Sequence, residues 1–291
     1  MANDQAAAMD HTHERAAWDR IAPDYDRTNT PTQMALAHDG LRRAAVSHGM
    51  RFLDVAAGSG ALAIPAARLG ARVVAVDQSP VMLQHLAARA SQEGLEIETH
   101  VMDGHALALR DDSFDVVGSQ FGVMLFPDMR KGISEMARVT KPGGRVLVLA
   151  YGDPHRIDFL NVFVTAVQSV RPEFTGPPED PPPLEFQLAD PARMREALVL
   201  SGLDDVNVRT VTESTEFPSG DALWDWVLGS NPIVECLLAT LELAAEDRQT
   251  IRQALNRQVR LRMENGKPAV LSNPVNVAIG VKRLDKVVGR S

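Results

Sequence analysis

The sequence predicts an α/β protein built on a mostly parallel sheet. Between residues 51 and 150, short apolar segments of strand length alternate with segments in which apolar residues recur at helical spacing. The strand candidates are apolar on consecutive positions, which is typical of strands covered on both faces by helices. In such sheets, ligands bind beyond the carboxyl ends of the strands. We therefore expect a binding site where these segments end.

Two helices are expected before the sheet, over residues 14–25 and 32–47, because apolar residues such as Trp18, Ile21 and Tyr25 recur at helical spacing. Residues 1–10 read as a frayed tail. His11 and His13 form a pair that invites a metal hypothesis, but no nearby third or fourth ligand completes a site. No metal is predicted.

The alternating region gives strands over 51–55, 71–76, 97–102, 114–118 and 145–150, with helices over 61–69, 80–91 and 129–140. Beyond it, we expect a helix over 162–170, a lid border over 171–184, a helix over 191–203, a strand over 206–217, a helical block over 219–264 and a closing strand over 275–282. The lid border contains six prolines and little periodicity. Trp224 and Trp226 are interpreted as core residues.

The predicted organisation is one cofactor-binding core interrupted by two insertions. Its parts are an N-terminal helical segment (1–50), the core (51–152), a lid insertion (153–190), a continuation of the core (191–217), a helical cap (218–268) and a closing strand with a tail (269–291).

Composition narrows the classes of partner. The chain has 291 residues and a formal charge of −8, with no lysine-rich block, which disfavours nucleic acid. The single cysteine, Cys236, excludes an intrachain disulfide, and neither a signal peptide nor a membrane span is found. A cytoplasmic protein that acts on a small molecule is expected, and a homodimer is compatible with the sequence.

Each predicted strand ends in residues suited to bind a nucleoside. The first runs into a glycine loop after Asp54, the second ends at Asp77, and the third at Asp103. Each carboxylate also has a structural reading, as a turn cap, a helix cap or part of an ordinary turn. Their occurrence at successive strand ends favours a ligand.

Two cofactor classes fit a glycine loop followed by an acidic strand end. Gly58-x-Gly60-x-x-Ala63 matches the looser dinucleotide pattern. However, no lysine or arginine lies between residues 52 and 67 to neutralise a diphosphate, and Asp54 would repel one. A cationic amino-acid nucleoside fits better.

The chain resembles class I S-adenosylmethionine-dependent methyltransferases, especially the group related to ubiquinone/menaquinone-biosynthesis C-methyltransferases. The resemblance covers about residues 18–152 and depends on Trp18-Asp19-x-Ile21-Ala22-x-x-Tyr25-Asp26, Leu53-Asp54-Val55-Ala56-Ala57-Gly58-Ser59-Gly60, Val76-Asp77, Met102-Asp103-Gly104, Phe114-Asp115-Val116-Val117 and Lys141-Pro142-Gly143-Gly144-Arg145. The first family glycine is Ala56 here. The last motif is read as a turn into the fifth strand.

The resemblance implies a Rossmann-like, seven-stranded, mostly parallel sheet whose final strand is antiparallel, with N-terminal helices and a helical cap. It also implies S-adenosylmethionine as cofactor and S-adenosylhomocysteine as product. The cofactor would be held by Tyr25, Asp54, Ala56, Gly58, Gly60, Asp77, Gln78, Met82, Met102, Asp103, Gly104, Ser119, Gln120 and Phe121.

The expected reaction is methyl transfer to carbon or oxygen of a small organic acceptor, in specialised or quinone-like metabolism. Met124 and Phe126, just after the fourth strand, are the candidates to face the acceptor. Orientation of the reactants can supply much of the catalysis, so a base is optional, and His155 is the candidate. A non-methylating S-adenosylmethionine enzyme, a nicotinamide-dependent oxidoreductase and a noncatalytic binding protein are the alternatives.

Overall fold

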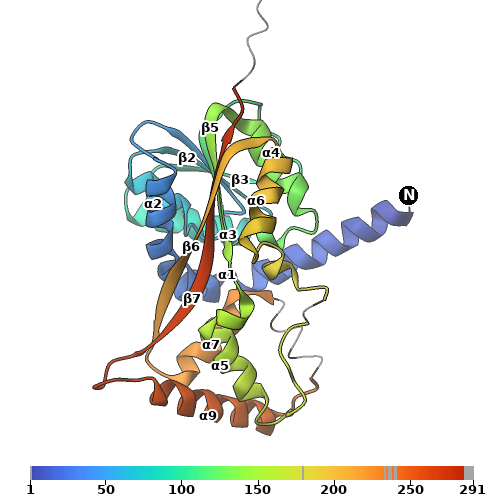
Figure 1. Cartoon of the computed structure of the whole chain (residues 1–291), viewed down its shortest axis with the longest axis vertical. Helices are drawn as coiled ribbons and strands as arrows, with labels where there is room; N and C mark the ends of the chain where they lie inside the picture. Colours follow the sequence, from blue (N-terminus) through green and yellow to red (C-terminus); the bar gives the residue numbers. More distant parts are fainter. Residues whose placement is uncertain (1, 179, 233, 235–237, 239–240, 285–291) are drawn as a thin grey trace, which may run out of the picture.

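A seven-stranded sheet forms the centre of the protein, which is described here from a computed structural model (Figure 1). The structure describes residues 2–178, 180–232, 234, 238 and 241–284, with side chains from residue 15 onward. The strand order is β3-β2-β1-β4-β5-β7-β6. The strands are β1 (Arg51–Val55), β2 (Arg72–Asp77), β3 (Ile97–Val101), β4 (Phe114–Gln120), β5 (Thr140–Tyr151), β6 (Leu203–Phe217) and β7 (Ala269–Lys282).

The pairing confirms the predicted topology. The first five strands pair with one another in parallel, whereas β7 runs antiparallel to both β5 and β6. The strand order reverses between β1 and β4, because β2 and β3 lie on one side of β1 and the later strands on the other. The carboxyl ends of β1 and β4 therefore border the switch point at which such sheets bind ligands.

Helices cover both faces of the sheet. In Figure 1, α2 lies on one side of the sheet and α4 and α6 lie on the other. The helices and short 3-10 turns are α1 (Ala2–Arg43), α2 (Ala63–Arg68), α3 (Pro80–Gln92), η1 (Val123–Leu125), α4 (Met129–Val139), η2 (Pro154–Arg156), α5 (Asp158–Val167), η3 (Leu184–Phe186), α6 (Pro191–Leu200), α7 (Gly220–Ser230) and α9 (Ala245–Leu261).

Local sequence explains where the core helices begin. Ser79 caps α3 by accepting a hydrogen bond from the Met82 amide (3.0 Å), and Pro80 occupies the first turn. Asp128 caps α4 in the same way through the Lys131 amide (3.0 Å). The turns before α3 and α4 are thus shaped by side chains within the turns themselves.

The N-terminal region differs from its prediction. One helix, α1, stands where a frayed tail and two separate helices were expected. Pro23 and Pro31 lie inside it, yet the helix continues, since Ile21, Ala37 and Leu41 along its length are buried against the body of the protein. The N-terminal part of α1 extends away from that body (Figure 1). The tertiary contacts outweigh the two proline interruptions.

Other boundaries also differ from the prediction: α5 begins four residues earlier than expected, β6 three and β7 six. The motif 141–145 lies inside β5, where the register moves from Thr140 opposite Phe114 to Arg145 opposite Val116, so the expected turn is a bulge. Ser119 and Gln120 belong to β4 itself. The helical block 219–264 is divided into α7 and α9, with part of the intervening stretch outside the described residues.

The ends of β6 and β7 support a second group of helices. Residues 212–217 pair with 269–274 beyond the last residue of β5, so the two strands form a long ribbon. Helices α5, α7 and α9 gather at the end of this ribbon (Figure 1). Their apolar side chains form a cluster separate from the main core, in which Trp224 and Trp226 are both buried, as predicted.

Helices α7 and α9 approach each other closely at Gly220. A Cβ atom at this position would lie 2.2 Å from the backbone nitrogen of Asn256, so only glycine fits.

In the part of the chain that the structure describes, no helix is both long and apolar enough to cross a membrane.

Candidate active site

The carboxyl end of β1, just before the glycine loop, holds one carboxylate in a fully buried position. Asp54 lies within β1, and its side chain is only 1% exposed. Neither carboxylate oxygen has a hydrogen-bond partner among the described residues. Burial, and then the charge of Asp77, raise the pKa of Asp54 well above its usual value. A positively charged ligand group would relieve this unfavourable situation.

The backbone of the loop takes the left-handed conformation at three positions, with φ values of 56° at Ala56, 53° at Gly58 and 101° at Gly60. A Cβ atom on Gly60 would lie 2.9 Å from the Ile64 side chain, so this glycine allows α2 to pack closely behind the loop. A Cβ atom on Gly58 would instead lie 3.7 Å from the Tyr25 ring, an ordinary contact distance, and Gly58 lines the cavity.

Asp77 joins the end of β2 to the glycine loop. Its carboxylate accepts hydrogen bonds from the Gly58 amide and the Ser79 amide, both at 2.8 Å. Burial raises its pKa to about 6, although these two hydrogen bonds oppose the rise. The orientation of the carboxylate is therefore set by the backbone before any ligand binds.

The ends of β3 and β4 complete the rim. Asp103 accepts a hydrogen bond from the His105 amide (2.8 Å), and the His105 ring lies against Phe126 with centroids 4.5 Å apart. A Cβ atom on Gly104 would lie 2.4 Å from the Phe126 ring. On β4, Gln120 donates to the Gln33 carbonyl (2.9 Å), while its Oε1 is buried with no partner among the described residues.

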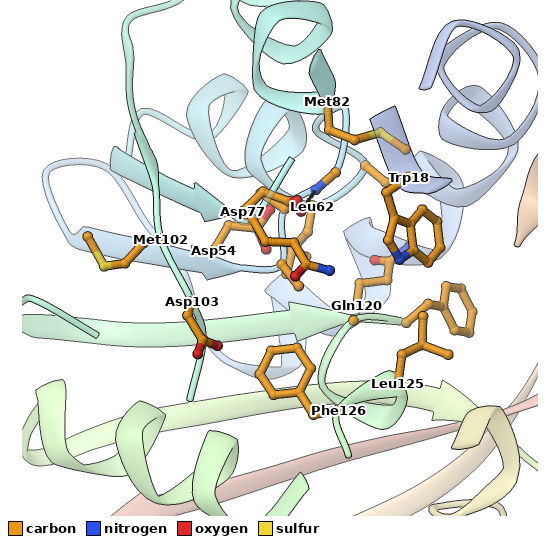
Figure 2. A pocket seen from close by; sticks show the side chains of 18 of the residues that line it. Trp18, Asp54, Leu62, Asp77, Met82, Met102, Asp103, Gln120, Leu125 and Phe126 are labelled. Atoms are coloured by element: carbon orange, nitrogen blue, oxygen red, sulfur yellow. Dashed lines mark hydrogen bonds between the residues drawn. The ribbon is translucent and has the colours of Figure 1, made fainter. Parts of the chain in front are cut away.

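These strand ends enclose one cavity (Figure 2). In Figure 2, Asp54 and Asp77 lie side by side at its centre, Met102 and Asp103 border one end, and Trp18 and Leu125 border the other. The predicted cofactor residues that line it are Tyr25, Asp54, Ala56, Gly58, Asp77, Gln78, Met82, Met102, Asp103, Gly104, Gln120 and Phe121.

Two predicted cofactor residues do not line the cavity. Gly60 packs against α2, and the buried Ser119 hydroxyl accepts a hydrogen bond from the Val123 amide (3.0 Å), so it shapes the turn after β4. Lining residues that sequence reasoning did not assign are Trp18, Ala57, Ala61, Leu62, His105, Gly122, Leu125 and Pro127. Trp18 could have been found, because it lies seven residues before Tyr25 and so on the same side of a helix.

The donor set of this cavity fits a cationic amino-acid nucleoside. Three aspartates and no lysine or arginine are found among its described lining residues. The unpaired, buried Asp54 carboxylate is the partner that an ammonium group requires, whereas a diphosphate would meet only negative charge there. The residues present therefore fit S-adenosylmethionine.

A second, largely apolar cavity of about 320 Å³ adjoins the first. The two share Trp18, Tyr25, Phe121 and Leu125. Aromatic rings continue from this shared wall. Phe121 stacks on Tyr151 with ring centroids 4.6 Å apart, and Tyr151 meets Phe159 edge-on with centroids 5.8 Å apart. Its size lies in the range of small-molecule sites.

The opposite wall of the second cavity comes from the proline-rich stretch, which contributes Pro177, Pro178, Pro183, Glu185 and Phe186. Gln187 fastens this segment to the core, because its Nε2 donates to the carbonyls of Met124 (2.6 Å) and Phe126 (3.0 Å). The end of the predicted lid insertion (153–190) is thus held directly against the loop that follows β4.

The predicted acceptor and base residues lie in different places relative to the two cavities. Met124 lines the second cavity, whereas Phe126 lines the first. His155 lies exposed in η2, where its amide donates to Asp153 (3.0 Å), and it lines neither cavity. The structure therefore does not bring His155 to the site.

Comparisons with known proteins agree with this geometry. A methyltransferase domain family matches residues 53–148. Demethylmenaquinone methyltransferase of Renibacterium salmoninarum is 34% identical over 183 residues, which cover 61% of this chain and 75% of that protein. An uncharacterised protein of Mycobacterium tuberculosis is 32% identical over 261 residues, covering 86% of this chain and 89% of its own.

Among solved structures, YcgJ of Bacillus subtilis matches 86% of this chain and 98% of its own with a TM-score of 0.57 and 19% identity, which shows a shared fold. The chain belongs to the class I S-adenosylmethionine-dependent methyltransferases, in the group related to menaquinone methyltransferases. It is an enzyme of that class and uses S-adenosylmethionine, so the dinucleotide alternative is set aside.

Proposed function

We propose that the enzyme transfers the methyl group of S-adenosylmethionine to carbon or oxygen of a small, planar, apolar acceptor in quinone-like or specialised metabolism. The observation that carries this proposal is the wall that the two cavities share at Trp18, Tyr25, Phe121 and Leu125. A donor in the acidic cavity and an acceptor in the apolar cavity would meet at this wall.

In the acidic cavity, Asp54 would bind the ammonium group of the cofactor and Asp77 its ribose hydroxyls. Met102 and Asp103 would surround the adenine together with the adjacent Gly104, because Met102 and Asp103 border the end of the cavity away from Trp18. Tyr25 would close over the methionine part from α1, where its hydroxyl is oriented by a hydrogen bond to Gln33 Oε1 (2.9 Å). When bound, the cofactor supplies an electrophilic methyl group on a sulfonium.

The acceptor class follows from the lining of the second cavity. Its rings and prolines favour a flat apolar molecule and exclude water from the reacting atoms. The demethylmenaquinone methyltransferases among the relatives are named for a quinone-type acceptor. A reduced bicyclic ring with a hydroxyl group combines the flat apolar body with a nucleophilic carbon or oxygen.

We also propose a division of labour between the predicted parts of the chain. The core (51–152 and 191–217, with the closing strand after 269) would hold the cofactor. The lid insertion (153–190) and the helical cap (218–268) would select the acceptor, since residues from both line the apolar cavity.

A radiolabel assay tests the proposal. Purified protein with methyl-labelled S-adenosylmethionine is offered 1,4-dihydroxynaphthalene under reducing conditions, and phosphoethanolamine as a charged acceptor. We expect label in the naphthalene product and none in the charged compound. Asp54→Asn serves as the cofactor-site control and should lower transfer through weaker cofactor binding. Transfer to the charged acceptor alone, or to neither compound, would contradict the proposed acceptor class.

A further inference from the structure

Glu185 is the one formally charged residue among the described residues that line the apolar cavity. It lies in η3, two residues before the Gln187 side chain that fastens the lid to the loop after β4. Because η3 is held at this point, the carboxylate has a defined position relative to the wall shared with the cofactor cavity. The rest of the lining consists of aromatic, aliphatic and uncharged polar side chains.

The two oxygens of Glu185 differ. Oε1 accepts a long hydrogen bond from the side-chain Nδ2 of Asn231 (3.4 Å), whereas Oε2 is buried and has no partner among the described residues. A buried carboxylate oxygen without a partner is costly unless a ligand supplies a donor. The free oxygen therefore indicates where a polar group of the acceptor would bind.

The electrostatic environment of Glu185 favours the uptake of a proton by its carboxylate. The titratable side chains that share the cavity with it are Tyr25 and Tyr151, and burial raises the pKa of both phenols. Burial also raises the pKa of Glu185 above that of an exposed glutamate. A carboxylate of this kind is a better base than one in water.

We propose that Glu185 is a catalytic residue that binds the hydroxyl group of the acceptor and takes its proton. This inference rests on the proposed function and specifies its substrate class as a hydroxylated aromatic or enol. Acceptors that lack the hydroxyl would leave the Glu185 oxygen unpaired and would be rejected.

The step balances without any further reactant. The acceptor O–H bond breaks and its proton passes to Glu185 Oε2, which leaves an electron pair on the oxygen and the conjugated carbon. That pair forms the new bond to the methyl carbon while the S–CH₃ bond breaks and its electrons stay on sulfur. In O-methylation, Glu185 then releases its proton to solvent. In C-methylation, it returns the proton to the carbonyl oxygen while the ring proton leaves to water.

The test compares wild type with Glu185→Gln and Glu185→Asp. Glu173→Gln is the matched control, because Glu173 is an exposed glutamate of the same lid segment. With 1,4-dihydroxynaphthalene, we expect kcat/KM to fall about 100-fold to 10,000-fold in Glu185→Gln. S-adenosylmethionine affinity, measured by calorimetry, should stay unchanged, and Glu173→Gln should match wild type.

The pH profile separates a base from a structural residue. In wild type and Glu185→Asp, log kcat/KM should rise with pH through the pKa of the carboxyl group, and in Glu185→Gln this limb should be absent. If the wild type methylates this acceptor and Glu185→Gln shows the same kcat/KM and the same rise with pH, the role of Glu185 is overturned while the proposed function stands. An inactive wild type would overturn the proposed acceptor and this inference together. Intact cofactor binding shows that the variant is folded.

Discussion

Glu213 provides a test of the structure that is independent of catalysis. It lies on β6 opposite Asn273 of β7, on the ribbon that supports the cap, and its side chain is only 7% exposed. Burial raises its pKa to about 7. Because an unfolded chain exposes the same carboxyl group to water, its ionisation is penalised only in the folded protein.

The sign and size of the effect follow from this difference. Between pH 4.5 and about 7, the folded state holds the proton while the unfolded state loses it, so the free energy of unfolding falls as the pH rises. Above pH 7 the full penalty is present, on the order of 3 kcal/mol at 1.36 kcal/mol for each tenfold change in proton affinity. Below pH 4.5 it vanishes.

Glu213→Gln replaces the carboxyl group with a neutral side chain of the same shape. We expect it to raise the free energy of unfolding by about 2–3 kcal/mol at pH 8 and to leave it unchanged near pH 4.5. Urea unfolding followed by circular dichroism across this range measures the difference. Glu216→Gln is the control, because Glu216 is exposed on the opposite face of the same strand. Equal pH dependence in wild type and Glu213→Gln would refute the reasoning.

Three further outcomes concern the site. Asp77→Ala should weaken S-adenosylmethionine binding about 10-fold to 100-fold in calorimetry, the range for hydrogen bonds to a charged group, without lowering the unfolding midpoint by more than a few degrees. Wild-type affinity should fall as the pH drops below about 6, where Asp77 takes up a proton. Gln187→Ala removes both hydrogen bonds between the lid and the loop after β4, so it should raise the acceptor KM several-fold while cofactor affinity stays constant. Unchanged affinity in the first variant, or unchanged KM in the second, would contradict the role assigned to that side chain.

The acidic cavity was predictable because its parts are local. Asp54, Asp77 and Asp103 each lie at or just beyond the end of a strand, and parallel strands bring their carboxyl ends to one edge of a sheet. Periodicity locates the strands, so it also locates the carboxylates. The same reasoning could not separate Gly60, which packs against a helix, from Gly58, which lines the cavity.

Most of the apolar cavity was beyond sequence reasoning, although the predicted Met124 does line it, because its wall is assembled from distant segments. Tyr25, Phe121, Tyr151, Glu185 and Val227 come from different elements and meet only after the lid and the cap have packed against the sheet. A proline-rich stretch has no period that would indicate which side chain faces inward. Glu185 therefore reads in the sequence as one more surface glutamate.

The sequence by itself determined the parallel sheet, the acidic strand ends and the methyl donor, because each depends on residues that are neighbours along the chain. Tertiary structure decided that α1 continues through Pro23 and Pro31, that His155 lies away from both cavities and that Gln187 holds the lid. These features depend on which buried surfaces meet in three dimensions, and local propensity does not specify that.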